Sequence, residues 1–426
     1  MDNTLTDSAQ PAQPPGHGSK SVEFTASSEP DAASPHVPTQ GEASSLDGTP
    51  AEGDHVRPET GAVDGYLREP RLSGWTIDFL ERVRLILRGG SVIDWYRLGF
   101  ETAEEVREFL EVNGHDVDDA ADQQRVRALL KEAASYLRSE LDLDVPTSLS
   151  EPDTLDWPFL VASRRSSDPK ESADQRTACI LLKLVHTMNH LEARELRLAL
   201  ALPEVEVFAR VEARVGDSMR RLQQEGLPIL RFDMSRKARD STITKLLSKR
   251  RATAAQILDR LRFRVLVEQR SDIPSALAAM TRLLVPYNHV IPEESSNNLI
   301  DFPSFARSIP RLRPWLGGLQ FRLDLEREDP LTRDFNECSA DEFRMINFVV
   351  DVPVRVDDVV ARPEHAHLGG LGRIVFVNAE FQIYDLTTWQ NNERNTAASH
   401  DAYKARQKER VRERLHEGLE RTWGNG

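Results

Sequence analysis

The sequence predicts an α+β protein in which an N-terminal all-helical region is followed by a mixed β-sheet flanked by helices. Two observations support this fold class. Between residues 67 and 226, apolar residues recur at every third or fourth position, which is the period of an amphipathic helix. After Gly226, several segments alternate apolar and polar residues, which is the period of a strand, and helical stretches separate them. Because the purely helical part precedes the strands, an α+β arrangement is favoured.

Residues 1–65 are expected to form a disordered acidic tail rich in Pro, Gly and Ser. They contain 11 acidic residues against Lys20 and Arg57, so a net charge of −9 lies in this segment. Few large apolar side chains accompany these charges, and such a segment cannot bury enough surface to offset the loss of backbone entropy. A solubilising or tethering role is the simplest function for it.

The helical domain, residues 66–204, is recognised by the spacing of its apolar side chains. Trp75, Phe79, Val83 and Leu87 follow one another four residues apart, and Gly89–Gly90 ends their helix. The segment 176–200 is long and strongly apolar on one face. Further helices are expected at 103–112, 122–140, 171–199 and 204–225.

The second half of the chain is where strands are expected. Leu261–Val267 alternates apolar and basic residues, and the following segment, 273–285, returns to a helical period. Gly369–Gly372 is a turn cluster between the last two strands, which therefore form a hairpin. Strands are expected at 261–267, 319–325, 345–356 and 373–384, and a charged helix is expected at Tyr403–Arg421.

Composition excludes several classes of protein. The 426 residues include 55 basic and 69 acidic ones, a formal charge of −14, which argues against a generally basic nucleic-acid coat. No apolar run approaches the ~18–20 residues needed to span a bilayer, so no membrane association is expected. The first residues lack a basic stretch and an apolar segment, so no signal peptide is expected there. Cys179 and Cys338 are too few for a disulfide framework or a four-cysteine zinc site, which favours a cytoplasmic protein.

Two short motifs have simpler structural explanations. Gly89-Gly90-Ser91 resembles a phosphate-binding loop, but it follows a helix, and a helix end followed by a new helix start explains it better. His186 and His190 lie four apart on an expected helix, a spacing that suits zinc or iron. No third ligand is evident nearby in the sequence, which favours a packing role for both histidines.

A dense basic run lies inside this acidic protein and leads to a carboxylate at the start of a strand. Basic side chains bind phosphates, and a carboxylate such as Asp259 at a strand end can hold a divalent cation against them. The alternative is a solvated basic helix. The run consists of Arg236, Lys237, Arg239, Lys245, Lys249, Arg250 and Arg251.

A second group of polar residues follows about 120 residues later. Glu380 and Gln382 share one face of the expected strand 373–384, because side chains alternate with period two. His400, Tyr403 and Lys404 share one face of the C-terminal helix. If their strands are neighbours, Asp259 and Glu380 together could hold Mg²⁺.

The order of these segments resembles the RelA/SpoT-type nucleotidyltransferase domain, which makes the alarmone (p)ppGpp. That family has a basic segment of the form Arg-x-Lys-x-x-x-Ser-Ile-x-x-Lys-Leu, followed by Asp-x-x-Gly-x-Arg-Val on its first strand. It ends with Glu-x-Gln-Ile-Arg-Thr and, about twenty residues later, His-x-x-Tyr-Lys. The resemblance covers about residues 205–410, within an expected domain of residues 205–426. The matching residues are Lys237, Ser241, Lys245, Leu246, Asp259, Arg264, Val265, Glu380, Gln382, Ile383, His400, Tyr403 and Lys404.

The resemblance implies a nucleotidyltransferase-like fold and a Mg²⁺-dependent transfer of pyrophosphate from ATP to the 3′-hydroxyl of GDP or GTP. It makes Asp259 and Glu380 the catalytic acids and the metal ligands. The phosphate-binding residues implied are Lys237, Ser241, Lys245 and Arg264. The acceptor-binding residues implied are Phe343, Gln382, His400, Tyr403 and Lys404.

The sequence departs from the family pattern at identifiable positions. Ser235 replaces the first Arg of the basic motif, Arg262 replaces the Gly, and Tyr384 replaces the Arg after Gln-Ile. The segment Asn-Gly-Tyr-Gln-Ser-Leu-His is not visible, and residues 342–347 are its best positional substitute, with Phe343 as the base-stacking ring. The helical half lacks the paired His-Asp signature of the family's hydrolase domain, so no alarmone hydrolysis is expected.

These departures leave two alternatives to the enzymatic interpretation. One is a catalytically inactive synthetase-like fold that serves as a nucleotide sensor or interaction module. The other keeps the chemistry but transfers to an RNA 3′ end, because the basic run 236–251 suits a phosphate backbone.

Overall fold

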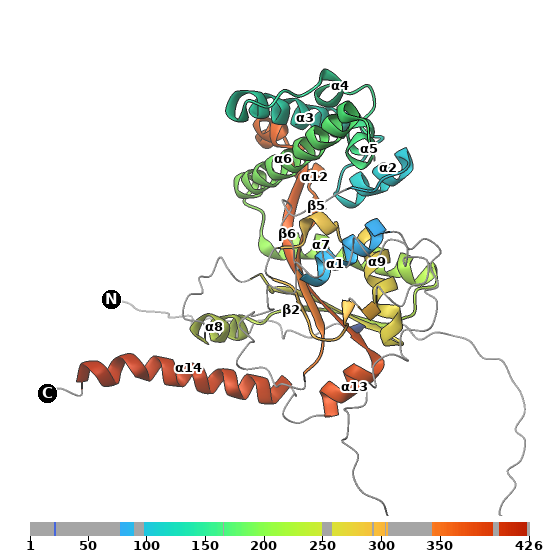
Figure 1. Ribbon diagram of the computed structural model, residues 1–426. Coiled ribbons are helices and arrows are strands. Elements are labelled where there is room, and N and C mark those ends of the chain that lie inside the picture. Colours follow the sequence, from blue (N-terminus) through green and yellow to red (C-terminus); the bar gives the residue numbers. More distant parts are fainter. Residues whose placement is uncertain are drawn as a thin grey trace, which may run out of the picture.

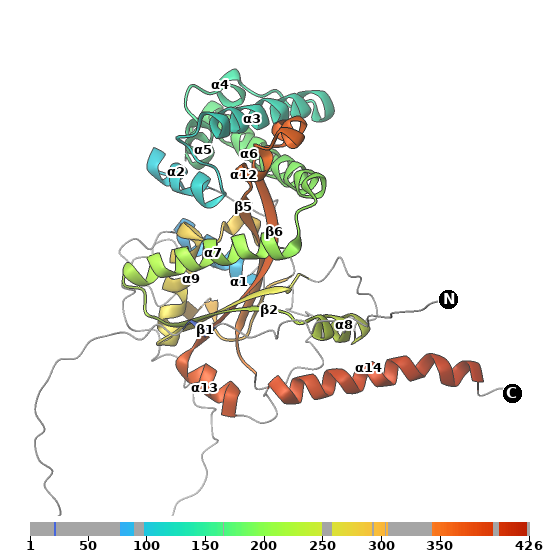
Figure 2. The same ribbon diagram turned by 180° about the vertical axis from the view of Figure 1, so that it is seen from behind.

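The computed structural model contains one mixed β-sheet with a helical region beyond one end of its longest strands (Figure 1). Helices α13 (Leu386–Arg394) and α14 (His400–Trp423) lie near the opposite end (Figures 1 and 2). The α+β fold class expected from the sequence is therefore confirmed. The structure describes residues 21–22, 77–88, 98–164, 166–248, 258–291, 294–302, 304–305, 343–394 and 400–423.

The helical region forms around one apolar core. Its helices bury one face each, and α6 packs against both α3 and α5. Helix α2 starts with a capping box in which Thr102 and Glu105 satisfy each other's backbone N–H groups. The expected helices at 103–112, 122–140 and 171–199 are confirmed. The helices are α2 (Ala103–Val112), α3 (Ala120–Leu141), α4 (Thr147–Ser150), α5 (Trp157–Ser163) and α6 (Pro169–Leu200).

The sheet has the strand order β1-β2-β3-β6-β5-β4. Strands β3 and β6 are parallel, whereas the other neighbours are antiparallel, which makes the sheet mixed. Three of the expected strands are confirmed, and the fourth, 319–325, lies outside the described residues. The strands are β1 (Ser21–Val22), β2 (Ile229–Arg236), β3 (Leu261–Val267), β4 (Ser296–Asn297), β5 (Ile346–Arg355) and β6 (Ile374–Asp385).

The expected hairpin of the last two strands is confirmed, although its connection is not a tight turn. Strands β5 and β6 pair antiparallel over ten residues, from Ile346↔Ile383 to Arg355↔Ile374. Helix α12 (Asp357–Val360) and the 3₁₀ helix η7 (Pro363–Leu371) form the connection. Gly372, at φ +87°, ends η7 in a conformation that favours glycine.

One face of the sheet is apolar and forms the main core. Phe263, Phe381 and Phe348 stack across three neighbouring strands with ring centroids 5.1 and 5.5 Å apart. The helices α1 (Ile77–Arg88), α7 (Glu204–Gln224) and α9 (Ile273–Leu283) contribute buried side chains to this core. The expected helices over these three segments are confirmed, and most of the buried side chains of α1 belong to this core.

The opposite face of the sheet carries most of its polar side chains, and the sequence did not predict the strands β1, β2 and β4. In the sequence of strand β2, Ile-Leu-Arg-Phe-Asp-Met-Ser-Arg, apolar and polar residues alternate only weakly, so a strand was not expected there. In the structure, only Ile229 and Phe232 of this strand are buried. It pairs with β3 on one side and with Ser21–Val22 on the other. The rest of the expected N-terminal tail lies outside the described residues.

The helical region is joined to the β5–β6 hairpin by close backbone approach and by arginine hydrogen bonds. At Gly114, with φ +95°, an added Cβ would lie 3.2 Å from Pro353 Cβ and 3.3 Å from Ile374 Cδ1. Arg355 donates to the Gly114 carbonyl at 3.0 Å, and Arg197 of α6 donates to the Phe376 carbonyl at 2.8 Å. These contacts hold α6 and the segment after α2 against the β5–β6 hairpin.

Two helices close the C-terminal part of the chain. Helix α13 (Leu386–Arg394) follows β6 directly, and α14 (His400–Trp423) confirms the expected charged helix. Helix α14 runs beside α8 (Arg239–Ser248), and Arg414 donates to the Leu247 carbonyl (Figures 1 and 2). Among the described residues, none of the helices combines the length and the apolar character that crossing a membrane requires.

Candidate functional site

The alternation of β3 and the parallel pairing with β6 create a row of polar contacts. Leu261, Phe263 and Val265 are fully buried on the apolar face, so Arg262 and Arg264 project from the polar face. The register places Arg262 opposite Glu380 and Arg264 opposite Gln382. Each facing pair is in contact: Arg262 Nε donates to Glu380, and Arg264 Nε donates to Gln382 Oε1 at 3.2 Å.

Asp259 lies just before β3 and is surrounded by positive charge. Its Oδ2 atom is 2.6 Å from Lys237 Nζ and 2.8 Å from Lys245 Nζ. Lys237 follows the end of β2, and Lys245 lies on α8, so three separate segments meet at one carboxylate. The backbone N–H of Lys237 donates to the Arg260 carbonyl at 2.8 Å, which holds the ends of β2 and β3 together.

The neighbouring cations favour the ionised form of Asp259. Burial alone would raise the pKa of Asp259, but Lys245 and Lys237 outweigh burial and hold that pKa well below its usual range. Burial lowers the pKa of Lys237, and Asp259 opposes this effect. Burial would also lower the pKa of Arg262, but Glu380 and then Asp259 raise it.

Arg262 connects the two acids that the sequence predicted to meet. Its guanidinium is paired with Glu380, and its Nη2 atom is 3.6 Å from Asp259 Oδ2. Asp259 and Glu380, about 120 residues apart in the sequence, therefore lie on either side of one guanidinium. Both are nearly buried, at 7% exposed each, but their partners are charged rather than apolar.

One of the two acids offers an oxygen atom that suits Mg²⁺. Magnesium prefers carboxylate oxygen ligands, and Asp259 Oδ1 is buried without a hydrogen-bond partner among the described residues. Asp259 therefore fits as a ligand. Glu380 is held by Arg262, so this guanidinium must move before both carboxylates reach one ion.

Gln382 continues the polar row toward the end of β6. Its Oε1 atom accepts from Arg264 and from the Tyr384 hydroxyl, each at 3.2 Å. Burial raises the pKa of Tyr384 to about 12, so its hydroxyl remains a donor at neutral pH. Trp389 of α13 packs against Tyr384 with ring centroids 5.4 Å apart.

The structure thus brings together six of the residues singled out by the sequence: Lys237, Lys245, Asp259, Arg264, Glu380 and Gln382. Ser241 lies on α8, half-buried. Phe343, also half-buried, precedes β5, and its carbonyl accepts from Asn298 Nδ2 at 2.7 Å. On α14, Tyr403 is half-buried and Lys404 is exposed. His400 begins α14, but its side chain lies outside the description, as do Lys249, Arg250 and Arg251.

Sequence reasoning missed the part played by Arg262. The position was noted only as a departure from glycine, although the alternation Leu-Arg-Phe-Arg already places its side chain with that of Arg264. Its contact with both acids depends on the parallel register of β3 and β6, which the sequence does not specify.

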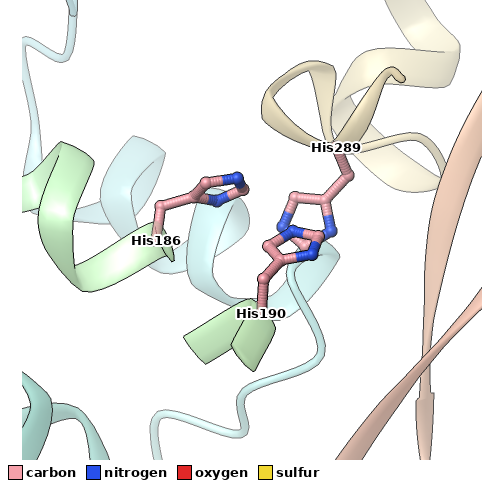
Figure 3. Close-up of side chains that lie close together, drawn as sticks. All are labelled: His186, His190 and His289. Atoms are coloured by element: carbon pink, nitrogen blue, oxygen red, sulfur yellow. The ribbon is translucent and has the colours of Figure 1, made fainter. Parts of the chain in front are cut away.

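A second polar cluster, formed by three histidines, lies where α6 meets the segment after α9. The third member is His289 of the 3₁₀ helix η5 (Tyr287–His289), about a hundred residues beyond His186 and His190. The ring centroids are 4.4, 5.0 and 4.7 Å apart, and Figure 3 shows the three rings converging. Burial lowers the pKa of His190 to about 4 and the pKa values of His186 and His289 well below their ordinary range.

Comparison with solved structures finds alarmone synthetases. The chain is similar to small alarmone synthetase 2 from Bacillus subtilis, with 16% identity, a TM-score of 0.26, and coverage of 52% of this chain and 96% of that chain. It is also similar to small alarmone synthetase 1 from Bacillus subtilis bound to its product pppGpp, with 13% identity, a TM-score of 0.26, and coverage of 51% and 89%. For a GTP pyrophosphokinase family protein from Streptococcus pneumoniae the identity is 13%, the TM-score 0.25, and the coverage 52% and 90%.

The chain resembles small alarmone synthetases over about half of its length. No protein-family model matches the sequence. No curated protein matches it either.

Proposed function

We propose that the polar face of the sheet binds ATP and a guanine nucleotide and transfers pyrophosphate from ATP to the 3′-hydroxyl of GDP or GTP. The observation that supports this proposal is the meeting of Asp259 and Glu380 around Arg262, next to Lys237 and Lys245. Acids and phosphate-binding cations from four segments converge there. The order of the matched motifs in the sequence agrees with this reaction.

The charges of the site suit the reaction. In this transfer the acceptor oxygen attacks the β-phosphorus of ATP, AMP leaves, and the hydroxyl proton passes to a base. Such a step needs charge neutralisation and positioning more than covalent help from the protein. Lys237, Lys245 and Arg264 are assigned to the phosphates, and each good charge-assisted contact is worth about 1.5–3 kcal/mol.

The two acids have different parts in the proposal. Asp259 would hold Mg²⁺ through Oδ1, the oxygen without a partner among the described residues, and the ion would neutralise phosphate charge. Glu380 accepts the hydroxyl proton or becomes a second metal ligand once nucleotide phosphates draw Arg262 away. Gln382, held by Arg264 and Tyr384, faces the acceptor nucleotide. Phe343, His400, Tyr403 and Lys404 are assigned to the acceptor by the motif match alone.

One observation favours a second candidate, a nucleotide-binding module without turnover. Arg262 provides a built-in cation at the point where the metal would bridge the acids, and it stands where the family pattern has glycine. With Arg262 in place, the site holds four cations and two carboxylates, so it attracts phosphates even without a metal. The cations are Lys237, Lys245, Arg262 and Arg264, and the carboxylates are Asp259 and Glu380.

One experiment separates the two candidates. Purified protein is incubated with labelled ATP, Mg²⁺ and GDP or GTP, and transfer and nucleotide affinity are both measured. Transfer that is lost in Asp259→Asn and Glu380→Gln supports the enzyme. The nucleotide-binding module is supported if the wild-type protein binds nucleotide without transfer. It is supported further if Arg262→Gly gains transfer and the matched control Arg260→Gly does not. Absence of both binding and transfer rejects both candidates.

The RNA alternative is not proposed. Its basic residues Lys249, Arg250 and Arg251 lie outside the described residues, and the contacts of Lys237 and Lys245 are with Asp259.

A further inference from the structure

Three histidines from two distant parts of the chain form a compact cluster away from the proposed nucleotide site. His186 and His190 lie one turn apart on α6, and His289 comes from η5 (Figure 3). One ring nitrogen from each lies within 4.8 Å of the others. The cluster stacks on Phe376 of β6, whose ring centroid is 4.2 Å from that of His190. Imidazoles brought together in this way are the usual nitrogen ligands of zinc.

A hydrogen bond orients the ring of His289, and a nearby carboxylate faces the ring of His190, as is usual for histidine metal ligands. His289 Nδ1 lies 3.2 Å from the backbone carbonyl of Asp351, so Nδ1 carries the proton and Nε2 has a lone pair. His190 Nδ1 lies 3.6 Å from the Asp351 carboxylate. The Nε2 atoms of both rings are buried without a partner among the described residues. Buried polar atoms are rarely left in this state, and a ligated metal would satisfy both.

We propose that His186, His190 and His289 bind one Zn²⁺ ion, with Asp351 positioning two of the three rings. His190 and His289 bind through Nε2. His186 Nδ1 lies 3.2 Å from Asn288 Nδ2, so His186 binds through Nε2 once Asn288 turns its amide oxygen to Nδ1 and the ring changes tautomer. A water molecule or another small donor takes the fourth position. Asp351 does not contact the ion: its backbone carbonyl accepts from His289 Nδ1, and its carboxylate faces His190 Nδ1 at 3.6 Å.

The geometry requires a small rearrangement. In a tetrahedral site with Zn–N bonds of about 2.0–2.1 Å, ligand nitrogens lie about 3.3 Å apart. The nitrogens here lie within 4.8 Å, so rotation of the rings about their side-chain bonds brings them to a common centre.

A zinc ion at this site would join the helical region to the sheet, because its ligands come from both. His186 and His190 belong to the helical region, whereas His289 precedes Val290, which is bridged to Val350 of β5. An ion bound here crosslinks α6 to the sheet. Zinc therefore stabilises the contact between the helical region and the sheet, whatever reaction the sheet performs.

The test uses the full chain after removal of metals with a chelator. Zinc is returned, bound metal is measured by mass spectrometry after desalting, and thermal unfolding is followed with and without zinc. We expect one zinc per chain and a melting temperature that rises with zinc concentration. His190→Gln and His289→Gln are expected to lose the bound zinc and the temperature shift. His367→Gln removes an exposed histidine outside the cluster and is the matched control, with unchanged binding.

A separate measurement on the unaltered chain covers the case in which a variant does not fold. Co²⁺ in place of zinc is expected to give the visible absorption of a four-coordinate site, without the thiolate charge-transfer band that a cysteine ligand produces. Absence of both zinc retention and this spectrum in the wild-type chain would overturn the proposal. Zinc binding that persists in folded His190→Gln and His289→Gln would overturn it as well.

Discussion

Asp259→Asn is the substitution for which the structure allows the most complete prediction of stability. Asp259 is 7% exposed, and its Oδ2 atom contacts Lys237 at 2.6 Å and Lys245 at 2.8 Å. At these separations each attraction is about 6 kcal/mol for an effective dielectric constant of 20, before desolvation is subtracted. Desolvation offsets much of this gain, and removal of one partner from a buried ion cluster typically costs about 3–5 kcal/mol. Asparagine keeps the shape but leaves two ammonium groups close together without their counter-charge.

The expected loss depends on pH in a defined direction. The pKa of the Asp259 carboxyl in the folded protein lies well below its usual value, because Lys245 and Lys237 outweigh the effect of burial. Its contribution is therefore complete above the unfolded pKa of about 3.9 and is lost as the pH falls through the lower folded value. The difference in unfolding free energy between wild type and Asp259→Asn should be about 3–5 kcal/mol at pH 7. It should shrink as the pH falls below 4.

Urea unfolding of the two proteins at pH 7 and at a series of lower pH values measures this difference. Asp118→Asn is the control, because Asp118 pairs with Arg107 at 2.9 Å on an exposed surface and should lose less stability. A difference below about 1 kcal/mol at pH 7, or one that does not change with pH, would refute the reasoning about charge at Asp259.

Three further predictions follow from the contacts. Gly114→Ala should lower the free energy of unfolding, measured with urea, more than Gly226→Ala does. Both glycines have positive φ, but only at Gly114 would the new Cβ approach neighbouring atoms, Pro353 Cβ at 3.2 Å and Ile374 Cδ1 at 3.3 Å. Arg264→Met should weaken nucleotide binding by about 10- to 100-fold in calorimetry, since one charge-assisted contact is worth about 1.5–3 kcal/mol; equal affinity would remove this residue from the phosphate site. Phe263→Ala should lower the unfolding free energy by about 3–5 kcal/mol in urea unfolding, because its ring is fully buried between Phe232 and Phe381.

Much of the secondary structure could be predicted because its periodicity is local. The strand Leu261–Val267 was predicted at its observed bounds, since alternation of apolar and basic residues marks a strand with one buried face. Strand β2 was not predicted, because it carries charge at Arg231, Asp233 and Arg236 and lies near the edge of the sheet. Pairing with β3 provides the hydrogen-bond partners of its backbone, and its own composition does not indicate this pairing.

The candidate site was partly predictable for the same reason. Asp259, Lys237 and Lys245 lie within one short stretch of sequence, and Glu380 and Gln382 lie in another, so each group could be recognised from spacing. That the two groups meet depends on the parallel pairing of β3 with β6, which joins residues about 120 positions apart. Such long-range pairing leaves no periodic signal in a single sequence.

The sequence by itself determined the class of the elements and the residue types that can bind phosphate, because both depend on neighbours a few positions away. Only the tertiary structure decided that Arg262 lies between Asp259 and Glu380 and that His289 joins His186 and His190. The physical reason is the same in both cases. Register and helix docking are set by the burial of apolar faces from distant segments, and the polar side chains on the opposite faces are brought together as a consequence.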